Sequence, residues 1–314
     1  MKKILLTGAT GFVGSALLAR LNPENVVCCG RNQPSCNDVK FYKGEIDQLA
    51  DFSECLAGVD VVIHLAARVH VMNESSSDPL GAYRETNVLG TLNLARQAKE
   101  AGIKRFIYLS TIKVNGESTL SGQAFRFDDL PAPQDYYGQS KAEAEAGLIE
   151  LTKNSSFEVT IIRPPLVYGA GVKANFRLMM KLASLRIPLP LGAIQNKRSL
   201  VSLDNLIDLI LTCVEHPKAS NQIFLVSDGE DISTSDLVRL MRISIGRRPL
   251  LIPVPQKMLE VFARFIGRKN LADRICGNLQ VDISHTVSLL NWYPKQSIQE
   301  GVKKTIQEAN RINV

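Results

Sequence analysis

The sequence predicts an α/β protein with a doubly wound parallel sheet. Two observations carry this prediction: five short segments are rich in Val, Ile and Leu, and helical patterns separate them. The expected strands are residues 3–7, 26–29, 61–66, 105–110 and 159–163. Nearly continuous apolar strands are typical of a sheet that is covered on both faces. Strands that alternate with helices are joined by right-handed crossovers, which produce a parallel sheet.

The segments between these strands carry the expected helices, at 12–22, 48–57, 78–101 and 137–153. After residue 163 the pattern changes, because Pro164, Pro165, Pro188 and Pro190 interrupt it. Helices are expected there at about 172–184, 204–216, 234–245 and 255–267, with a strand at 223–227. We therefore expect a first domain over 1–165 and a smaller, partly interleaved substrate domain over 166–314. About 198–228 of the second part is expected to return to the first domain.

The composition is ordinary for a soluble globular protein, with 45% hydrophobic and 22% charged residues in a chain of 314. The net charge of +6 is spread without a block of like charges, which disfavours nucleic-acid binding. No apolar run approaches the length of a membrane span. The six cysteines form no C-x-x-C pair and the four histidines are scattered, which disfavours a metal site and indicates reduced thiols in a cytoplasmic protein.

The segment G-A-T-G-F-V-G, residues 8–14, follows the first expected strand and begins the first expected helix. Gly8 allows a tight turn, Gly11 allows close approach of a pyrophosphate, and Gly14 allows the helix to pack on the strand. The pyrophosphate then lies at the helix N-terminus, where free N–H groups favour negative charge. The placement of the glycines between strand and helix predicts a dinucleotide site rather than a turn that binds nothing.

The glycine spacing and seven later motifs resemble the extended short-chain dehydrogenase/reductases, the nucleotide-sugar epimerase/dehydratase family. The motifs are H-L-A-A (64–67), N-V-L-G-T (87–91), L-S-T (109–111), Y-Y-G-Q-S-K (136–141), R-P-P-L-V-Y-G (163–169), K-R-S-L-V-S-L-D-N (197–205) and N-W-Y-P (291–294). They cover almost the whole chain. The resemblance implies a Rossmann fold, an NAD(P)-dependent enzyme and a nucleotide-sugar substrate. It also implies a homodimer, in which the helices at 78–101 and 137–153 pair across a two-fold axis.

Of the seven tyrosines, only Tyr137 has a lysine four residues later, Lys141. On a helix these two side chains lie on one face. A neighbouring ammonium and an oxidised nicotinamide ring would both favour phenolate and lower the pKa of Tyr137, which makes it the expected proton donor and acceptor. The resemblance implies that Lys141 also binds the nicotinamide ribose and that Thr111 supplies the catalytic hydroxyl.

The remaining site residues also follow from the resemblance. The dinucleotide contacts it implies are Gly8, Gly11, Phe12, Val13, Gly14, Arg31, Glu45, Ile46, Leu65, Ala66, Ala67, Asn87 and Lys141. The substrate contacts it implies are Thr111, Asn175, Phe176 and Arg198. Asn87 fits a structural position inside a helix equally well, and Asn175 and Arg198 are also compatible with ordinary surface positions.

Arg31 stands at the end of the second expected strand, where a dinucleotide-binding fold usually carries a carboxylate for the ribose hydroxyl. A 2′-phosphate would gain a charge-assisted contact with Arg31, worth about 1.5–3 kcal/mol. The sequence therefore favours NADP(H) over NAD(H) as the cofactor. A guanidinium stacked on the adenine would leave the same residue in this place, so NAD(H) stays open.

Ile112 and Lys113 follow Thr111, where dehydratases of the family resemble one another in an acidic pair. The sequence thus disfavours dehydration. Because NADPH suits net reduction, the first prediction is a UDP-4-keto-sugar reductase of polysaccharide biosynthesis. The alternative is a UDP-hexose 4-epimerase. A non-catalytic dinucleotide-sensing protein is a third hypothesis, although such proteins typically lose the tyrosine or the lysine that this chain retains.

Overall fold

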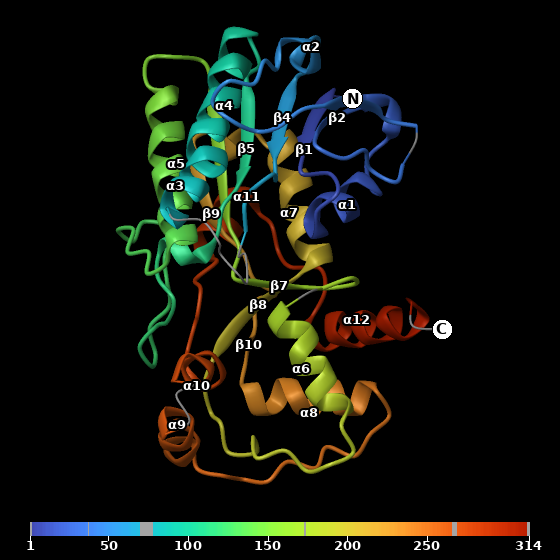
Figure 1. Ribbon diagram of the computed structural model, residues 1–314, viewed down its shortest axis with the longest axis vertical. Helices are drawn as coiled ribbons and strands as arrows, with labels where there is room; N and C mark the ends of the chain where they lie inside the picture. The colour runs from blue at the N-terminus through green and yellow to red at the C-terminus, as the bar shows by residue number, and fades with distance from the viewer. Residues whose placement is uncertain (1, 37, 70–77, 173, 266–268, 313–314) are drawn as a thin grey trace.

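The computed structural model describes residues 2–36, 38–69, 78–172, 174–265 and 269–312 (Figure 1). A seven-stranded sheet has the strand order β3-β2-β1-β4-β5-β6-β9, and every neighbouring pair is parallel. Its strands are β1 (Ile4–Thr7), β2 (Val26–Gly30), β3 (Lys40–Lys43), β4 (Val61–His64), β5 (Arg105–Leu109), β6 (Glu158–Arg163) and β9 (Gln222–Leu225). The predicted fold class, a doubly wound parallel sheet, is confirmed.

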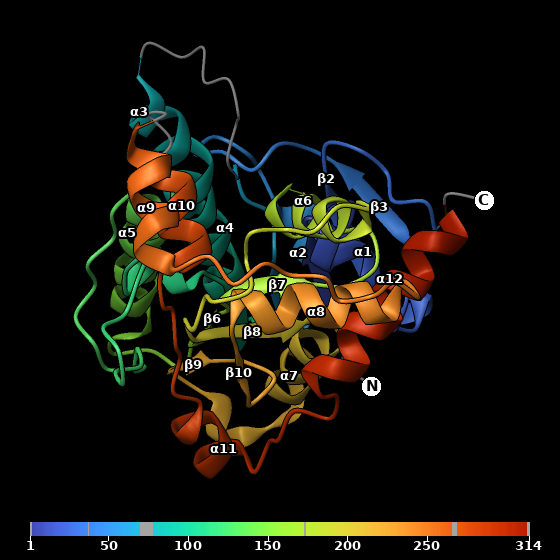
Figure 2. The ribbon, with the colours of Figure 1, turned by 90° about the horizontal axis from the view of Figure 1, so that it is seen from below.

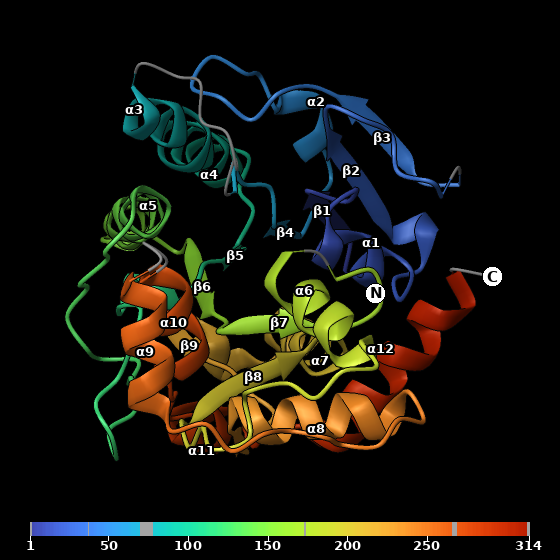
Figure 3. The ribbon, with the colours of Figure 1, turned by 60° about the horizontal axis from the view of Figure 1, so that its bottom comes forward.

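Helices cover both faces of this sheet (Figures 1 and 3). On one face, alternate strand residues such as Leu6 pack with α1 (Phe12–Leu18) and α7 (Leu203–Glu215). On the other face, residues such as Leu5 pack with α2 (Ser53–Leu56), α4 (Thr91–Glu100) and α5 (Tyr136–Thr152). Successive strand residues point to opposite faces. Because both faces are buried, the strands appear in the sequence as continuous apolar runs.

A second, three-stranded sheet contains β7 (Leu166–Tyr168), β8 (Arg198–Ser202) and β10 (Asp231–Ile232). The helices α6 (Ala174–Ser184), α8 (Thr234–Ser244) and α12 (Ile298–Ile312) pack beside it around a separate apolar cluster (Figure 2). The remaining helices are α9 (Gln256–Phe265), α10 (Lys269–Cys276) and α11 (Ser284–Leu290). Between β8 and β10 the chain forms α7, which packs on the large sheet, and β9, which is a strand of that sheet. The domain limits 1–165 and 166–314 themselves stay a prediction.

Some elements differ from the sequence-based expectation. The helix expected at 78–101 is divided into α3 (Pro79–Arg84), a π-helical turn over Glu85–Gly90, and α4. The edge strand β3 was not expected, because K-F-Y-K contains two lysines and only half-buried aromatic residues. None of the described helices is long and apolar enough to cross a membrane.

Candidate active site

The candidate site lies at the edge of the large sheet where the parallel strands end. The strand order reverses between β1 and β4, and ligands of such sheets bind in the crevice at this point. Because only Pro164 and Pro165 separate β6 from β7, this carboxyl edge faces the small sheet (Figure 1). The segments that leave the strands here carry Gly8, Arg31, Glu45, Leu65–Ala67 and Thr111.

The three glycines of residues 8–14 form a closely packed turn between β1 and α1. Gly8 has a φ of +73°, and a Cβ there would lie 2.7 Å from the backbone nitrogen of Ala66. A Cβ at Gly14 would overlap the carbonyl oxygen of Gly8, which also accepts a hydrogen bond from Gly11 N at 2.9 Å. Gly11, the N-cap of α1, has no side chain to occupy the first N–H groups. This cradle fits the pyrophosphate of a dinucleotide, with Phe12 and Val13 half-buried beside it.

A buried histidine fixes the segment Leu65–Ala67. His64 Nδ1 lies 2.7 Å from Thr7 Oγ1, and His64 Nε2 lies 2.9 Å from Thr91 Oγ1. Thr7 Oγ1 also accepts a hydrogen bond from Ala66 N at 3.3 Å. Burial, together with the charge of Lys141, lowers the pKa of His64 to about 3, so its imidazole is neutral. His64 therefore links β1, β4 and α4 and holds the expected dinucleotide-binding segment beside Gly8.

Asn87 is buried in the π-helical turn and connects two parts of the site. Its Oδ1 accepts a hydrogen bond from Arg68 N at 2.8 Å, and its Nδ2 donates to Arg68 O and to Ser140 Oγ, both at 3.0 Å. Ser140 Oγ in turn donates to Tyr137 O at 2.8 Å. Asn87 therefore ties the segment after β4 to the first turn of α5. Its direct contact with a cofactor stays a prediction.

Tyr137 and Lys141 lie on one face of α5, as their spacing predicts. Asp135 caps this helix by accepting a hydrogen bond from Gly138 N at 2.6 Å. Tyr137 is half-buried beside Tyr83, with 6.3 Å between the ring centroids. Lys141 is fully buried, and its ammonium lies 4.0 Å from the centroid of the Tyr108 ring.

The two side chains have strongly shifted pKa values. Burial lowers the pKa of Lys141 to about 7, against a smaller opposite effect of Glu145. Burial also raises the pKa of Tyr137 above its usual value, and the charge of Asp135 acts in the same direction. The protein alone therefore does not show the decrease that we expect from Lys141 together with an oxidised nicotinamide ring, because burial of the phenol and the charges of Asp135 and Tyr83 all raise its pKa.

The two hydroxyl residues after β5 have different surroundings. Ser110 is buried and its hydroxyl donates a hydrogen bond to the carboxylate of Glu145. Thr111 is half-buried, and among the described residues its Oγ1 makes a single long contact, of 3.4 Å, with Lys113 N. Thr111 is therefore the hydroxyl of this pair that is better placed to meet a substrate.

A buried ion pair beneath the site was not anticipated from the sequence. Arg163, at the end of β6, donates three hydrogen bonds to the carboxylate of Glu145 at 2.6–3.1 Å and one to Asn115 Oδ1 at 3.0 Å. Both charged side chains are almost completely buried. Glu145 follows Tyr137 and Lys141 at the same spacing of four residues, and this helical repeat is the signal that could have identified it.

The expected substrate residues have less uniform surroundings. Phe176 is fully buried and stacks on Tyr168, with 5.1 Å between the ring centroids, so its side chain belongs to the apolar core. Arg198 NH1 donates to the carbonyl oxygens of Arg274 and Gly277, at 3.1 and 3.0 Å. The side chain of Asn175 lies outside the described residues. A substrate role for these three residues stays a prediction.

The expected adenosine-side residues lie at the ends of β2 and β3. Arg31 and Glu45 are exposed, whereas Ile46 is buried in the core beneath them. Gly44 N donates to Gly30 O at 3.1 Å, which holds the two strand ends side by side. Arg31 and Glu45 are therefore both accessible to a ligand bound at this edge.

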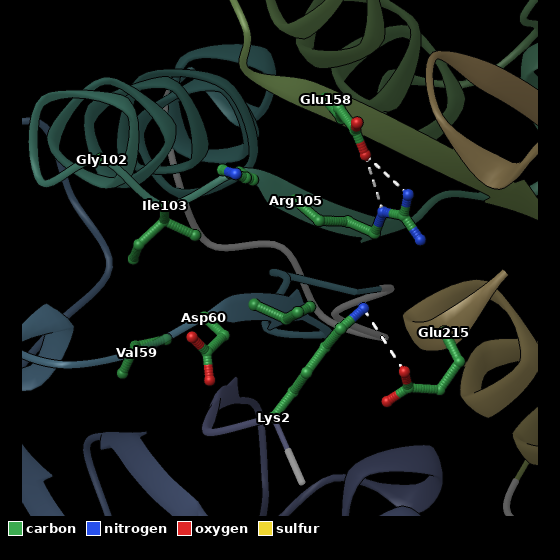
Figure 4. Close-up of a pocket in the computed structure, with 10 residues that line it drawn as sticks. Lys2, Val59, Asp60, Gly102, Ile103, Arg105, Glu158 and Glu215 are labelled. Carbon is green, nitrogen blue, oxygen red and sulfur yellow. Dashed lines mark hydrogen bonds and ion pairs between the residues drawn. The ribbon is translucent and has the colours of Figure 1, made fainter. Parts of the chain in front are cut away.

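A cavity of about 790 Å³ lies at the opposite, amino-terminal edge of the large sheet (Figure 4). Two of the three cations that line it are paired: Arg105 donates to Glu158 at 2.6 and 3.0 Å, and Lys2 lies 3.5 Å from Glu215. Arg105 NH1 also donates to carbonyl oxygens at the end of α7. These contacts join β5, β6 and α7, so we assign a structural role to this edge.

Comparisons with known proteins agree with this geometry. Residues 4–227 match the NAD dependent epimerase/dehydratase family. The chain is 51% identical to a UDP-glucose 4-epimerase of Vibrio cholerae, over 99% of this chain and 97% of that protein. It is 26% identical to N-acetyl-alpha-D-glucosaminyl-diphospho-ditrans,octacis-undecaprenol 4-epimerase of Escherichia coli O157:H7, over 97% of this chain and 94% of that protein.

Solved structures show the same fold. MoeE5 in complex with UDP-glucose and NAD has a TM-score of 0.78 at 22% identity, over 99% of this chain and 100% of that one. The UDP-glucose 4-epimerase of Thermotoga maritima with UDP-glucose has a TM-score of 0.78 at 21% identity, over 99% of both chains. From its sequence match and its fold, the chain belongs to the NAD dependent epimerase/dehydratase family, whose enzymes are extended short-chain dehydrogenase/reductases.

Proposed function

We propose that this protein is a UDP-hexose 4-epimerase that uses NAD(H). The observation that carries the proposal is the 51% identity, over nearly the full length of both chains, to a UDP-glucose 4-epimerase. The Tyr137–Lys141 pair on α5 and the glycine turn after β1 supply the groups that such a reaction needs. These observations favour epimerisation over the net reduction that the sequence first indicated.

In the proposed reaction, Tyr137 removes the proton of the C4 hydroxyl and later returns a proton to the C4 ketone. A bound nicotinamide would supply a reversible acceptor for the hydride of C4, so that the hydride could return to the opposite face of the sugar. The residues that would hold it are Gly8, Gly11, Gly14, Leu65–Ala67 and Lys141. Thr111 would donate a hydrogen bond to the C4 oxygen and stabilise the charge that develops there.

The electrostatics of the site suit a reversible proton transfer. The pKa of Tyr137 is raised, so its phenol is protonated near neutral pH and can donate. Lys141 has a pKa of about 7, so a small change in its surroundings changes its charge. A positively charged Lys141 favours the phenolate, which lets Tyr137 accept a proton.

The small sheet and its helices would hold the nucleoside diphosphate. Arg198 on β8 has a planar guanidinium that suits a pyrophosphate, although one of its nitrogens already donates to two backbone carbonyls. A contact through Phe176 would come from its backbone, because its side chain is buried. Residues 1–165 would thus bind the dinucleotide and 166–314 mainly the nucleotide-sugar.

The second candidate function is a UDP-4-keto-sugar reductase, and Arg31 is the observation that favours it. Arg31 is exposed directly after β2, at the strand end where a carboxylate would hold the ribose of NAD. The guanidinium of Arg31 would attract the 2′-phosphate of NADP(H). Cells keep this cofactor pool reduced, which suits a reductase.

One pair of incubations separates the two functions. With UDP-glucose, an epimerase forms UDP-galactose and leaves the nicotinamide absorbance unchanged over many turnovers. With a UDP-4-keto-6-deoxy-hexosamine and NADPH, a reductase consumes one NADPH for each ketone. We expect the first result, and NADPH consumption without any UDP-galactose would overturn the epimerase proposal.

A further inference from the structure

The helix α9 carries an apolar stripe on its exposed face. Met258, Val261, Phe262 and Phe265 are 62%, 65%, 63% and 89% exposed. Their spacing of three and four residues places them on one side of the helix. Helices of globular proteins normally turn such a stripe towards the core, so its exposure indicates an interaction surface.

The stripe lies at the outer end of the molecule. The helices α9 and α10 pack against each other beyond the small sheet, away from the large one (Figures 1 and 2). Leu250 and Ile252, in the segment that leads into α9, are apolar and about half-exposed as well. We call this set, Leu250, Ile252, Met258, Val261, Phe262 and Phe265, the α9 surface.

The chain around the α9 surface is rich in basic residues. In the sequence, residues 247–274 contain seven basic and two acidic residues. Arg248, Lys257, Arg264 and Arg274 are exposed, and no ion pair joins any of these four to a described residue. A helix with a strong apolar face and a basic polar face is the pattern that binds in the interface of a lipid bilayer.

We propose that the α9 surface docks this protein on an anionic membrane. The apolar stripe inserts at the boundary between headgroups and acyl chains, while Lys257 and Arg264 remain at the level of the headgroups. The helix lies in the plane of the membrane and does not cross it. This surface role does not depend on the reaction that the protein catalyses.

Charge complementarity favours a membrane over a second copy of the chain. Pairing two α9 surfaces across a two-fold axis would bring the exposed basic side chains of both copies together, which costs free energy. An anionic lipid surface instead attracts each exposed lysine or arginine by about 1 kcal/mol, or about fivefold in affinity. The excess of positive charge thus indicates a negatively charged partner.

The position of α10 relates this surface to the candidate site. Arg198 donates to the carbonyl oxygens that end α10, and the strand-like residues 278–281 lie beside Thr119 and Phe125 of the loop that follows Thr111. Docking through the α9 surface would therefore hold the substrate-side loop close to the membrane.

The test is co-sedimentation of the purified full-length protein with vesicles of phosphatidylcholine, alone or with phosphatidylglycerol. We expect binding to the anionic vesicles only, and its loss in high salt. The double variant Phe262→Asp, Phe265→Asp should lose binding. Lys257→Glu, Arg264→Glu should weaken it by at least about 30-fold, since two basic residues are removed.

Leu49→Asp is the matched control, because Leu49 is 87% exposed and lies in the segment between β3 and α2, beside the large sheet. This variant should bind like the parent, and the thermal unfolding of all variants should show that they fold. Equal binding of parent and α9 variants, or no binding of the parent to anionic vesicles, overturns the proposal. A dimeric parent whose Phe262→Asp, Phe265→Asp variant is monomeric would also overturn the proposal, because α9 would then be an interface between two copies of the chain.

Discussion

Tyr137 and Tyr136 are adjacent on α5 but point to different environments. Tyr137 is half-buried beside Tyr83, whereas Tyr136 is 53% exposed. We expect Tyr137→Phe to lower kcat by about 10²–10⁴-fold, because the variant loses the proton donor and acceptor. Tyr136→Phe should retain full kcat. The rates should be measured beside the dinucleotide affinity, which Tyr137→Phe should leave unchanged; a Tyr137→Phe variant with normal kcat would exclude the proposed mechanism.

Lys141 gives the stability of the protein a particular dependence on pH. Its pKa is about 7 in the folded protein and near 10.5 when unfolded, so the unfolded chain binds more protons between these values. The free energy of unfolding therefore rises with pH from about 7 to 10.5 because of this residue. Lys141→Met should remove this contribution. The difference in unfolding free energy between parent and variant, measured by urea denaturation, should change across this window, and a constant difference would contradict the burial of Lys141.

Single residues with a fixed local spacing could be predicted from the sequence. Gly8, Gly14 and the Tyr137–Lys141 pair are of this kind, because a turn or a helix alone determines their geometry. The shifted pKa of Tyr137 could not be predicted, since it depends on how deeply the phenol is buried. The burial of Phe176 and the contact of Arg198 with the end of α10 could not be predicted either, because both depend on parts of the chain that are far apart in sequence.

Among the elements, α5 and β6 are joined by the buried Glu145–Arg163 pair. Breaking a buried pair leaves an uncompensated charge, which costs about 3–5 kcal/mol. We therefore expect Glu145→Gln to lower the free energy of unfolding by an amount of this order. Glu150→Gln is the control on the same helix, because Glu150 pairs with Lys153 in solvent and should matter little. Equal effects of the two variants in urea denaturation would contradict a structural role for the buried pair.

The helix α5 is also tied to the segment after β5 by Lys113. Its ammonium pairs with Asp135, the N-cap of α5, and with Glu117 at 2.9 Å. Burial raises the pKa of Tyr137 most, and the negative charge of Asp135 raises it further. The ammonium of Lys113 partly offsets this effect of Asp135.

Lys113→Met should therefore move the pH profile of kcat to higher pH, since Tyr137 would hold its proton more tightly. Lys113→Arg keeps the positive charge and should restore the parent profile. A profile that is unchanged in Lys113→Met would show that this ion pair does not act on Tyr137. The profile should be followed together with thermal unfolding, so that a general loss of structure is recognised.

For the whole molecule, the alternation of apolar strands and helices predicted the large sheet, including the return of 223–227 as β9. Edge strand β3 could not be predicted because two exposed lysines around two half-buried aromatic residues give no clear period. The π-helical turn at Glu85–Gly90 has no local sequence signal. The pattern of one chain also carries little information on assembly, so the homodimer remains an expectation from the family.

We expect that dimer to form through the helices at 78–101 and 137–153. Ile149 on α5 and Leu89 before α4 are partly exposed apolar residues of these helices. Ile149→Asp should convert the dimer into a monomer, because it would place a charge in the interface. Leu178→Asp on α6 should not, although Leu178 is similarly exposed. Light scattering during gel filtration gives the molar mass of the parent and of both variants. A monomeric parent would contradict the expected interface.

The reaction that we propose for this protein is inversion of the C4 configuration of a UDP-hexose. The most direct measurement is the fate of UDP-glucose, followed by proton NMR with the purified protein and a catalytic amount of NAD. We expect an equilibrium mixture of UDP-glucose and UDP-galactose, formed without accumulation of NADH and abolished by Tyr137→Phe. UDP-glucose that stays unchanged, together with stoichiometric reduction of a UDP-4-keto-sugar by NADPH, would contradict it.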